Sequence, residues 1–324
     1  MASKLSWLST CKSNQLKALA TAVGVNSSGT KPLLTSQLLE HLPKGYFNYS
    51  RNQTSFKAQY DIISIDMGIR NLAYCRLILP ESKFTTKSHE QKYIGNPAIT
   101  EWARIEMSKR IPKPAGEQDP RIAVKEAFDP LTYSHHAYTL VNTLLNNTPN
   151  HPTHILIERQ RFRSMGGSSV QEWTLRVNMF EAMIYAVLKS FSERGDWRGS
   201  VHPVAPAKVA KFWLGEKQGA ELEGTGTKSE NTKGAKISVV GRWLEEKNSP
   251  FQLEGQAKEM GERYLLRRKV GKRNKSKGRE GPVEIGKLDD LADCLLQGMA
   301  WIQWEKNRRL IMSSGIGALG EMGT

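Results

Sequence analysis

The chain has 324 residues, 39% of them hydrophobic, and carries a formal net charge of +15 with an isoelectric point near 9.7. This length can bury a sizeable core and predicts one large domain with a small appendage rather than two equal domains. The charge predicts a polyanionic partner, with nucleic acid first, because an anionic membrane surface is normally met by an amphipathic helix or a lipid anchor. No apolar run approaches the roughly 20 residues of a membrane span, so no membrane partner is expected.

The three cysteines, Cys11, Cys75 and Cys294, are far apart and have no histidine at a metal-binding spacing. Neither a disulfide framework nor a zinc site is indicated, and a reducing compartment fits. The sequence also lacks a Walker A loop, a dinucleotide fingerprint and any Ser-His-Asp or Cys-His set. No nucleotide cofactor is therefore expected.

The chain begins with leucines at helical spacing over 13–23 and 31–42, which predict two short helices separated by Gly24 and Gly29. The order of leucines, glycine and Lys31 in this stretch resembles the SAP motif, a small helical DNA-binding module. We expect this module over 1–45, followed by a polar linker over 46–59. The alternative is an ordinary helical hairpin that lies on the main domain.

The next two segments, 60–66 and 72–79, are rich in β-branched and large apolar residues, and the glycine and asparagine between them predict two strands joined by a tight connection. Asp66 lies at the exit of the first strand. A carboxylate near an apolar core costs free energy unless something positive faces it, which suggests a metal or a substrate cation. The alternative is that Asp66 simply starts the turn, as aspartate often does.

A second carboxylate, Glu158, ends another apolar strand, expected over 154–158. The basic, aromatic segment that follows ends in paired glycines and suits a mobile loop laid on phosphate, although a solvated basic loop fits it equally well. The loop residues expected to bind DNA are Arg159, Gln160, Arg161, Phe162, Arg163 and Met165. Between the two acidic strands the sequence predicts, in order, a loop over 85–96, a strand over 98–107, a loop over 109–129 and a helix over 131–145.

The rest of the chain alternates between short elements and basic segments. A long helix with a methionine-bearing apolar stripe, typical of core or subunit contact, is expected over 170–191. In order, there follow a strand over 200–204, a helix over 207–214, a flexible loop over 215–234, a helix over 235–247, a poorly ordered basic insertion over 258–287, a helix from 288 to about 309 and a disordered tail over 311–324. Further lysines expected to bind DNA are Lys208, Lys211, Lys236 and Lys287.

The last helix opens with three acids. Asp290 and Asp293 are three residues apart and therefore share one helix face, roughly 5 to 6 Å apart at Cβ, while Asp289 could take the place of Asp290. Alone, these acids are explained by capping and by the helix dipole. Asp66 and Glu158 make three separated carboxylate sites in one chain, which helix chemistry does not explain.

Four carboxylates without cysteine or histidine match Mg²⁺ or Mn²⁺ rather than zinc, because hard cations prefer oxygen ligands. Two such ions about 3.5 to 4 Å apart can activate water, stabilise the transition state and assist the leaving oxygen in phosphodiester hydrolysis. We therefore expect catalysis and metal binding at Asp66, Glu158, Asp290 and Asp293, with Asp66 as the bridging ligand.

Three short sequence motifs resemble those of a known family: Ile65-Asp66-x-Gly68-x-x-Asn71, Ile157-Glu158-Arg159-Gln160 and Asp290-x-x-Asp293-Cys294-Leu295. In this order, behind a SAP-like start, they resemble the RuvC-like resolvases and most specifically the fungal mitochondrial Holliday-junction resolvases. The resemblance implies an α/β, RNase H-like fold over 60–310, with a mixed five-stranded sheet flanked by helices. In that fold the Asp66 and Glu158 strands are parallel neighbours, and both carboxylates face the Asp290 helix.

The resemblance also implies an activity: a Mg²⁺-dependent mitochondrial endonuclease that resolves four-way DNA junctions by paired symmetric nicks and leaves 5′-phosphate and 3′-hydroxyl ends. Mn²⁺ is expected to substitute. A homodimer is expected because one carboxylate cluster supplies one cut, with the helix over 170–191, Trp301 and Trp304 as the contact surface and Phe162 and Met165 as a wedge at the junction centre. A non-catalytic DNA-packaging protein of the nucleoid and an RNase H-type hybrid nuclease are the alternatives.

Overall fold

The structure is a computed structural model, and its described residues form two compact units. The described residues are 2–45, 59–69, 71–85, 90–107, 129–148, 150–160, 172–215, 232–275 and 287–318. One unit comprises Met1–Ala58, Ala205–Lys236 and Leu296–Thr324, and the other comprises Gln59–Val204 and Ile237–Leu295. None of the described helices has a stretch long and apolar enough to cross a membrane.

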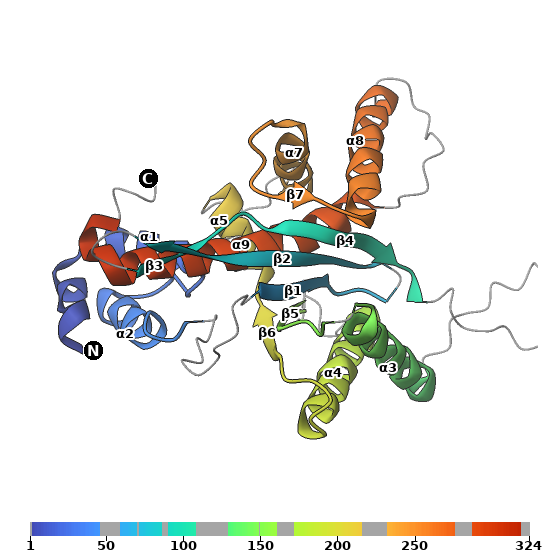
Figure 1. Ribbon diagram of the computed structural model, residues 1–324, viewed down its shortest axis with the longest axis horizontal. Coiled ribbons are helices and arrows are strands. Elements are labelled where there is room, and N and C mark those ends of the chain that lie inside the picture. Colours follow the sequence, from blue (N-terminus) through green and yellow to red (C-terminus); the bar gives the residue numbers. More distant parts are fainter. Residues whose placement is uncertain are drawn as a thin grey trace, which may run out of the picture. The chain divides into compact units, whose positions relative to one another are not determined.

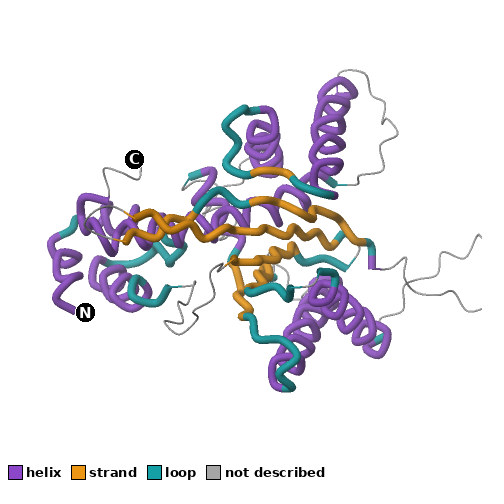
Figure 2. The backbone as a smooth tube through the Cα atoms, in the orientation of Figure 1, coloured by secondary structure: helices purple, strands orange, loops and turns teal. Residues whose placement is uncertain are grey.

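The second unit is built on a mixed sheet. Within the described residues the sheet has seven strands in the order β6-β5-β1-β2-β4-β7, with β3 paired to β2 (Figure 1). Figure 2 shows β1, β2 and β4 as neighbouring orange strands. The strands are β1 (Gln59–Asp66), β2 (Leu72–Thr85), β3 (Glu90–Ile94), β4 (Ala98–Ile105), β5 (His154–Glu158), β6 (Ser200–Val204) and β7 (Gln252–Leu253).

The centre of the sheet sets two strand ends side by side. β1 pairs antiparallel with β2 and parallel with β5, in a register that places Ile63 opposite Ile155 and Ile65 opposite Ile157. Because parallel strands end at the same edge of a sheet, Asp66 and Glu158 leave β1 and β5 together. The predicted parallel pairing of the two acidic strands is confirmed.

Two helices, α3 (Pro130–Asn146) and α4 (Glu172–Glu193), lie side by side on one face of this sheet (Figure 1). Successive side chains of a strand point to opposite faces, so Ile63 and Ile65 face these helices and share a buried core with them. Ser64 and Asp66 point the other way. The remaining helices that contribute to this unit are α7 (Thr232–Glu245), α8 (Gln256–Lys275), which packs on β4, and the first turns of α9 (Leu288–Ser314).

The first unit has its own core. Leucines of the N-terminal helices, among them Leu16 and Leu38, are buried together with Ile311 and Ala318 from the end of the chain. Gly24 has φ +68° and lies against the ring of Trp304, where a Cβ atom would come within 2.4 Å of the ring carbons. The described elements of this unit are η1 (Ala2–Thr10), α1 (Ser13–Ala22), α2 (Lys31–His41), α5 (Pro206–Leu214), the start of α7, the end of α9 and η3 (Gly315–Gly317).

Several expectations from the sequence were wrong. The loop expected over 85–96 contains β3, which pairs with an extension of β2 beyond its predicted end at 79. With β3 and β7, the sheet has seven described strands, whereas five were predicted. The insertion over 258–287 is a regular helix as far as Lys275, and α7 begins at Thr232, inside the expected flexible loop. The rest of that loop (216–231), the rest of the insertion (276–286) and most of the predicted linker (46–58) lie outside the described residues.

The C-terminal expectations also need correction. The tail expected to be disordered from 311 is helical to Ser314 and keeps Ile311 and Ala318 fully buried, because these residues pack against the N-terminal helices. Trp301 and Trp304 are only 1% and 3% exposed, so they are core residues and not the subunit-contact surface predicted for them. Residues 319–324 lie outside the described part of the chain.

A buried ion pair joins β1 to β2. Arg76, which is 1% exposed, donates from Nη2 to Asp61 Oδ2 at 2.6 Å, from Nη1 to Glu101 Oε1 at 3.3 Å and from Nη2 to the Asn150 carbonyl at 3.0 Å. Burial raises the pKa of Asp61, against the lowering effect of Arg76. Removing the guanidinium would therefore leave a buried carboxylate without its main partner.

We expect Arg76→Met to lower the free energy of unfolding by about 3 to 5 kcal/mol, the usual cost of leaving one member of a buried pair uncompensated. Urea unfolding followed by tryptophan fluorescence measures this loss. The double variant Arg76→Met, Asp61→Leu is the matched control, because replacing both members by apolar side chains is often neutral. A double variant as unstable as Arg76→Met would contradict the explanation.

Candidate active site

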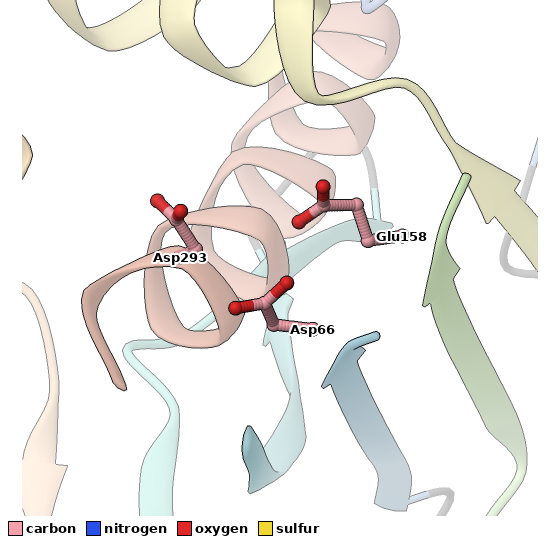
Figure 3. A group of neighbouring side chains, drawn as sticks. All are labelled: Asp66, Glu158 and Asp293. Atoms are coloured by element: carbon pink, nitrogen blue, oxygen red, sulfur yellow. The ribbon is translucent and has the colours of Figure 1, made fainter. Parts of the chain in front are cut away.

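Three carboxylates from distant parts of the chain meet at the edge of the sheet. Asp66 ends β1, Glu158 ends β5 and Asp293 lies in the second turn of α9. One ligand oxygen from each lies within 4.8 Å of the others, and Figure 3 shows the three side chains as neighbours. The convergence follows from the parallel pairing of β1 with β5 and from the position of α9.

Two side chains of the sheet fix α9 in this position. The Ser64 hydroxyl, two residues before Asp66 on the same face of β1, donates to the Cys294 carbonyl at 2.7 Å. The Trp102 indole of β4 donates to the Leu291 carbonyl at 3.0 Å. Both hydrogen bonds are buried, so they hold the turn of α9 that carries Asp293 against the strand that carries Asp66.

The electrostatics of the cluster are those of crowded acids. Asp66 is 9% exposed. Burial raises the pKa of Asp66 well above its ordinary value, and the charges of Glu158 and Asp293 raise it further. Like charges this close disfavour ionisation of one another, and a bound cation would reverse that effect.

Asp290 lies one turn before Asp293 on α9 and is not one of the three clustered carboxylates. The pKa of Asp290 is raised to about 6, mainly by burial and next by the charge of Asp289, while the charges of Lys287 and Arg104 lower it. Its Oδ2 atom is buried and has no hydrogen-bond partner within the described part of the chain. Asp289 and Asp290 both lie in the first turn of α9, where acids also interact favourably with the helix dipole.

The donor set fits a hard divalent cation. Three carboxylates within reach of one another, one of them nearly buried, offer oxygen ligands alone, which is the preference of Mg²⁺ and Mn²⁺. Asp290 adds a fourth carboxylate whose electrostatic effect reaches Asp66. The arrangement can therefore hold a cation that offsets the cost of crowding these acids.

The residues expected to bind DNA are distributed over both units. In the second unit, Arg159 and Lys287 are exposed, whereas Gln160 is half-buried and bonded to the protein itself. In the first unit, Lys31 is exposed, Lys236 is 7% exposed, and Lys208 and Lys211 line a small pocket with the α1–α2 connection. Arg161, Phe162, Arg163 and Met165 lie outside the described residues.

The mixed sheet, with acids at the ends of β1 and β5 and on the last helix, defines a protein of the RNase H-like class. The model of one family, described as "Mitochondrial resolvase Ydc2 / RNA splicing MRS1", matches residues 62–311. The chain belongs to this family.

Known relatives cover nearly the whole chain. The mitochondrial cruciform cutting endonuclease 1 of Schizosaccharomyces pombe is 25% identical over 302 residues, which cover 92% of this chain and 94% of the relative. The protein of the same name from Saccharomyces cerevisiae is 22% identical over 317 residues, covering 91% and 82%. The crystal structure of the yeast mitochondrial Holliday junction resolvase Ydc2 matches with a TM-score of 0.52 and 20% identity over 96% of this chain and 99% of that chain, which confirms the predicted fold.

Proposed function

We propose that this protein is a mitochondrial, structure-selective endonuclease that resolves four-way DNA junctions by metal-dependent hydrolysis. One observation carries the proposal: Asp66, Glu158 and Asp293 converge at one edge of the sheet in a chain of the resolvase family. The names of the relatives, cruciform cutting endonucleases of mitochondria, supply the substrate class and the location.

The family description covers both resolvases and an RNA splicing protein, and the acidic cluster favours the first. Binding RNA, or packaging DNA, gives no reason to crowd three carboxylates, because carboxylates repel phosphate. An RNase H-type hybrid nuclease would use the same kind of metal site. The substrate named for the relatives, a cruciform, favours a DNA junction over an RNA·DNA hybrid.

Asp66, Glu158 and Asp293 would hold the metal, and Asp290 would add a fourth carboxylate. When bound, Mg²⁺ would supply an activated water and charge stabilisation at the attacking and leaving oxygens. The 5′-phosphate and 3′-hydroxyl ends are those that the resemblance to the resolvases implies. The chain itself positions these acids through the β1–β5 pairing and the bonds from Ser64 and Trp102 to α9. Exposed Arg159 and Lys287 beside the acids attract the DNA backbone.

Other contacts to DNA follow from charge and position. Residues 1–45 act as a SAP-like module that adds affinity for DNA, with Lys31 exposed at its second helix, and Lys208, Lys211 and Lys236 add positive charge in the same compact unit. Phe162 and Met165, on the loop after Glu158, act as the apolar wedge at the junction centre.

The active protein is a two-fold symmetric homodimer, because a four-way junction becomes two duplexes only when two strands of like polarity are cut at symmetric positions. One carboxylate cluster supplies one cut. The first turn of α4 exposes Trp173 and Leu175, at 41% and 48%, which supports this helix as the contact between subunits.

The test is cleavage of a mobile-core four-way junction, a linear duplex and an RNA·DNA hybrid of equal length, with Mg²⁺ and with EDTA. We expect nicks in the junction alone, paired at symmetric positions, only with Mg²⁺, and sedimentation of two chains per bound junction. Preferred cleavage of the hybrid would instead identify the protein as an RNase H-type nuclease. Both cuts from a complex with one chain per junction would contradict the dimer.

A further inference from the structure

Gln160 joins the ends of the two acidic strands. It lies two residues after Glu158, and its side-chain amide donates from Nε2 to the Met67 carbonyl at 3.4 Å. Met67 directly follows Asp66 and is itself buried. One side chain therefore spans β5 and β1 just beyond the carboxylates.

A buried acid of α4 holds the backbone of the same residue. Glu181, which is 9% exposed, accepts a hydrogen bond at Oε2 from the Gln160 backbone N–H at 3.2 Å. Its neighbours along the helix, Phe180 and Ile184, are fully buried in the core, so Glu181 is presented from a rigid support. Burial raises the pKa of Glu181, and the Gln160 N–H lowers it most among the groups that favour its charge.

The residue between Glu158 and Gln160 is held from the opposite side. The Arg159 backbone N–H donates to the Val204 carbonyl of β6 at 2.9 Å, which continues the parallel pairing of β5 with β6 one residue beyond Glu158. The segment 158–160 is thus bonded to β6, α4 and the exit of β1 within three residues. All three hydrogen bonds are made by the two residues that directly follow Glu158.

We propose that Gln160 and Glu181 are positioning residues that hold the Glu158 carboxylate at its distance from Asp66, so that a divalent cation finds its ligands already in place. The inference rests on the proposed metal-dependent function. Carboxylates whose oxygens lie within 4.8 Å of one another repel when no cation is bound. If the segment after β5 lacked these hydrogen bonds, the repulsion would move Glu158 away from Asp66. Outer partners of metal ligands commonly change metal affinity or activity by about 10- to 100-fold.

This role differs from the DNA contact that the sequence predicts for Gln160, and the two roles give opposite results. The experiment compares wild type with Gln160→Ala and Glu181→Ala in three measurements: Mn²⁺ binding to the DNA-free protein by electron paramagnetic resonance, junction affinity in EDTA, and single-turnover cleavage against Mg²⁺ concentration. For both variants we expect Mn²⁺ affinity to fall by about 10-fold or more and the half-maximal Mg²⁺ concentration to rise by a similar factor. Junction affinity in EDTA should stay within about 2-fold, because neither side chain contributes charge to the DNA surface.

Glu181→Gln is the conservative control, since its amide oxygen can still accept from the Gln160 N–H, and it should retain most of the Mn²⁺ affinity. It also keeps the proposal testable if Glu181→Ala does not fold, which thermal melting shows. Arg159→Ala, an exposed cation on the same segment, should instead weaken junction binding in EDTA.

Unchanged Mn²⁺ affinity in Gln160→Ala overturns the proposal, and so does a loss confined to junction binding, which would assign Gln160 to the DNA. If wild type fails to cleave the junction while Mn²⁺ affinity still falls in the variants, the proposed substrate is wrong and the positioning role stands.

Discussion

Asp66→Asn is expected to abolish junction cleavage while leaving junction binding intact or tighter. Asp66 is nearly buried at the centre of the acidic cluster, and the amide keeps its size but lacks the charge that a divalent cation requires. Losing several kcal/mol of charge stabilisation in the transition state corresponds to a rate lower by about 10³-fold or more. Removing a negative charge beside phosphate favours binding. Single-turnover cleavage in Mg²⁺ and junction affinity in EDTA measure the two effects separately.

Glu193→Gln is a matched control for Asp66→Asn, because it also removes one acid but lies 67% exposed at the end of α4, in an ion pair with Lys189. It should cleave at the wild-type rate. The Asp66 variant should also fold with wild-type or greater stability, since the amide relieves repulsion from Glu158. Appreciable Mg²⁺-dependent nicking by Asp66→Asn would rule out the role assigned to this carboxylate.

The centre of the fold was predictable because its signals are local. The strands that carry Asp66 and Glu158 consist of apolar residues bounded by polar turns, and both ends were predicted correctly. The three acidic sequence motifs then predicted that the ends of these two strands lie side by side, and the parallel pairing of β1 with β5 confirms this prediction. Asp293 lies near these two acids, whereas Asp290, which was expected on the same helix face, is not one of the three clustered carboxylates.

The prediction from the sequence was wrong for a highly charged segment that forms a regular helix. α8 was expected to be poorly ordered because it is rich in Lys, Arg and Glu, yet these are good helix formers and a narrow apolar face is enough to anchor them. Tyr264 stacks on Trp102 of β4 with ring centroids 5.2 Å apart, and the Gln256 amide bonds both the N–H and the carbonyl of Trp102. Trp102 lies 154 residues before Gln256 in the sequence, so no local pattern could indicate these contacts.

Long-range contacts explain the other misses. Ile311 and Ala318 sit in a glycine-rich segment without a visible pattern, and only their packing against the N-terminal helices makes them core residues. The bonds that position the site, Ser64 to Cys294 and Gln160 to Met67, likewise join residues 230 and 93 positions apart. The alternation that places Ser64 on the same strand face as Asp66 was the one available signal.

The sequence left Asp289 and Asp290 as competing ligands, and the structure distinguishes their surroundings. Asp290 has a buried oxygen without a hydrogen-bond partner in the described part of the chain, and its charge raises the pKa of Asp66. Asp290 also shares a helix face with Asp293, three residues on. Asp290 is therefore the residue that we propose as the fourth carboxylate of the site.

Asp290→Asn should accordingly lower the single-turnover cleavage rate in Mg²⁺ by about 100-fold or more, at the upper end of outer-ligand effects and within the range of lost direct ligands. Asp289→Asn makes the same change one residue earlier, in the same helical turn, and should stay within about 3-fold of wild type because its loss of helix-dipole stabilisation is below about 1 kcal/mol. Mn²⁺ titration of the DNA-free proteins should rank them in the same order. The reverse ranking, an active Asp290 variant and an inactive Asp289 variant, would make Asp289 the ligand. It would also contradict the orientation that the structure gives to the first turn of α9.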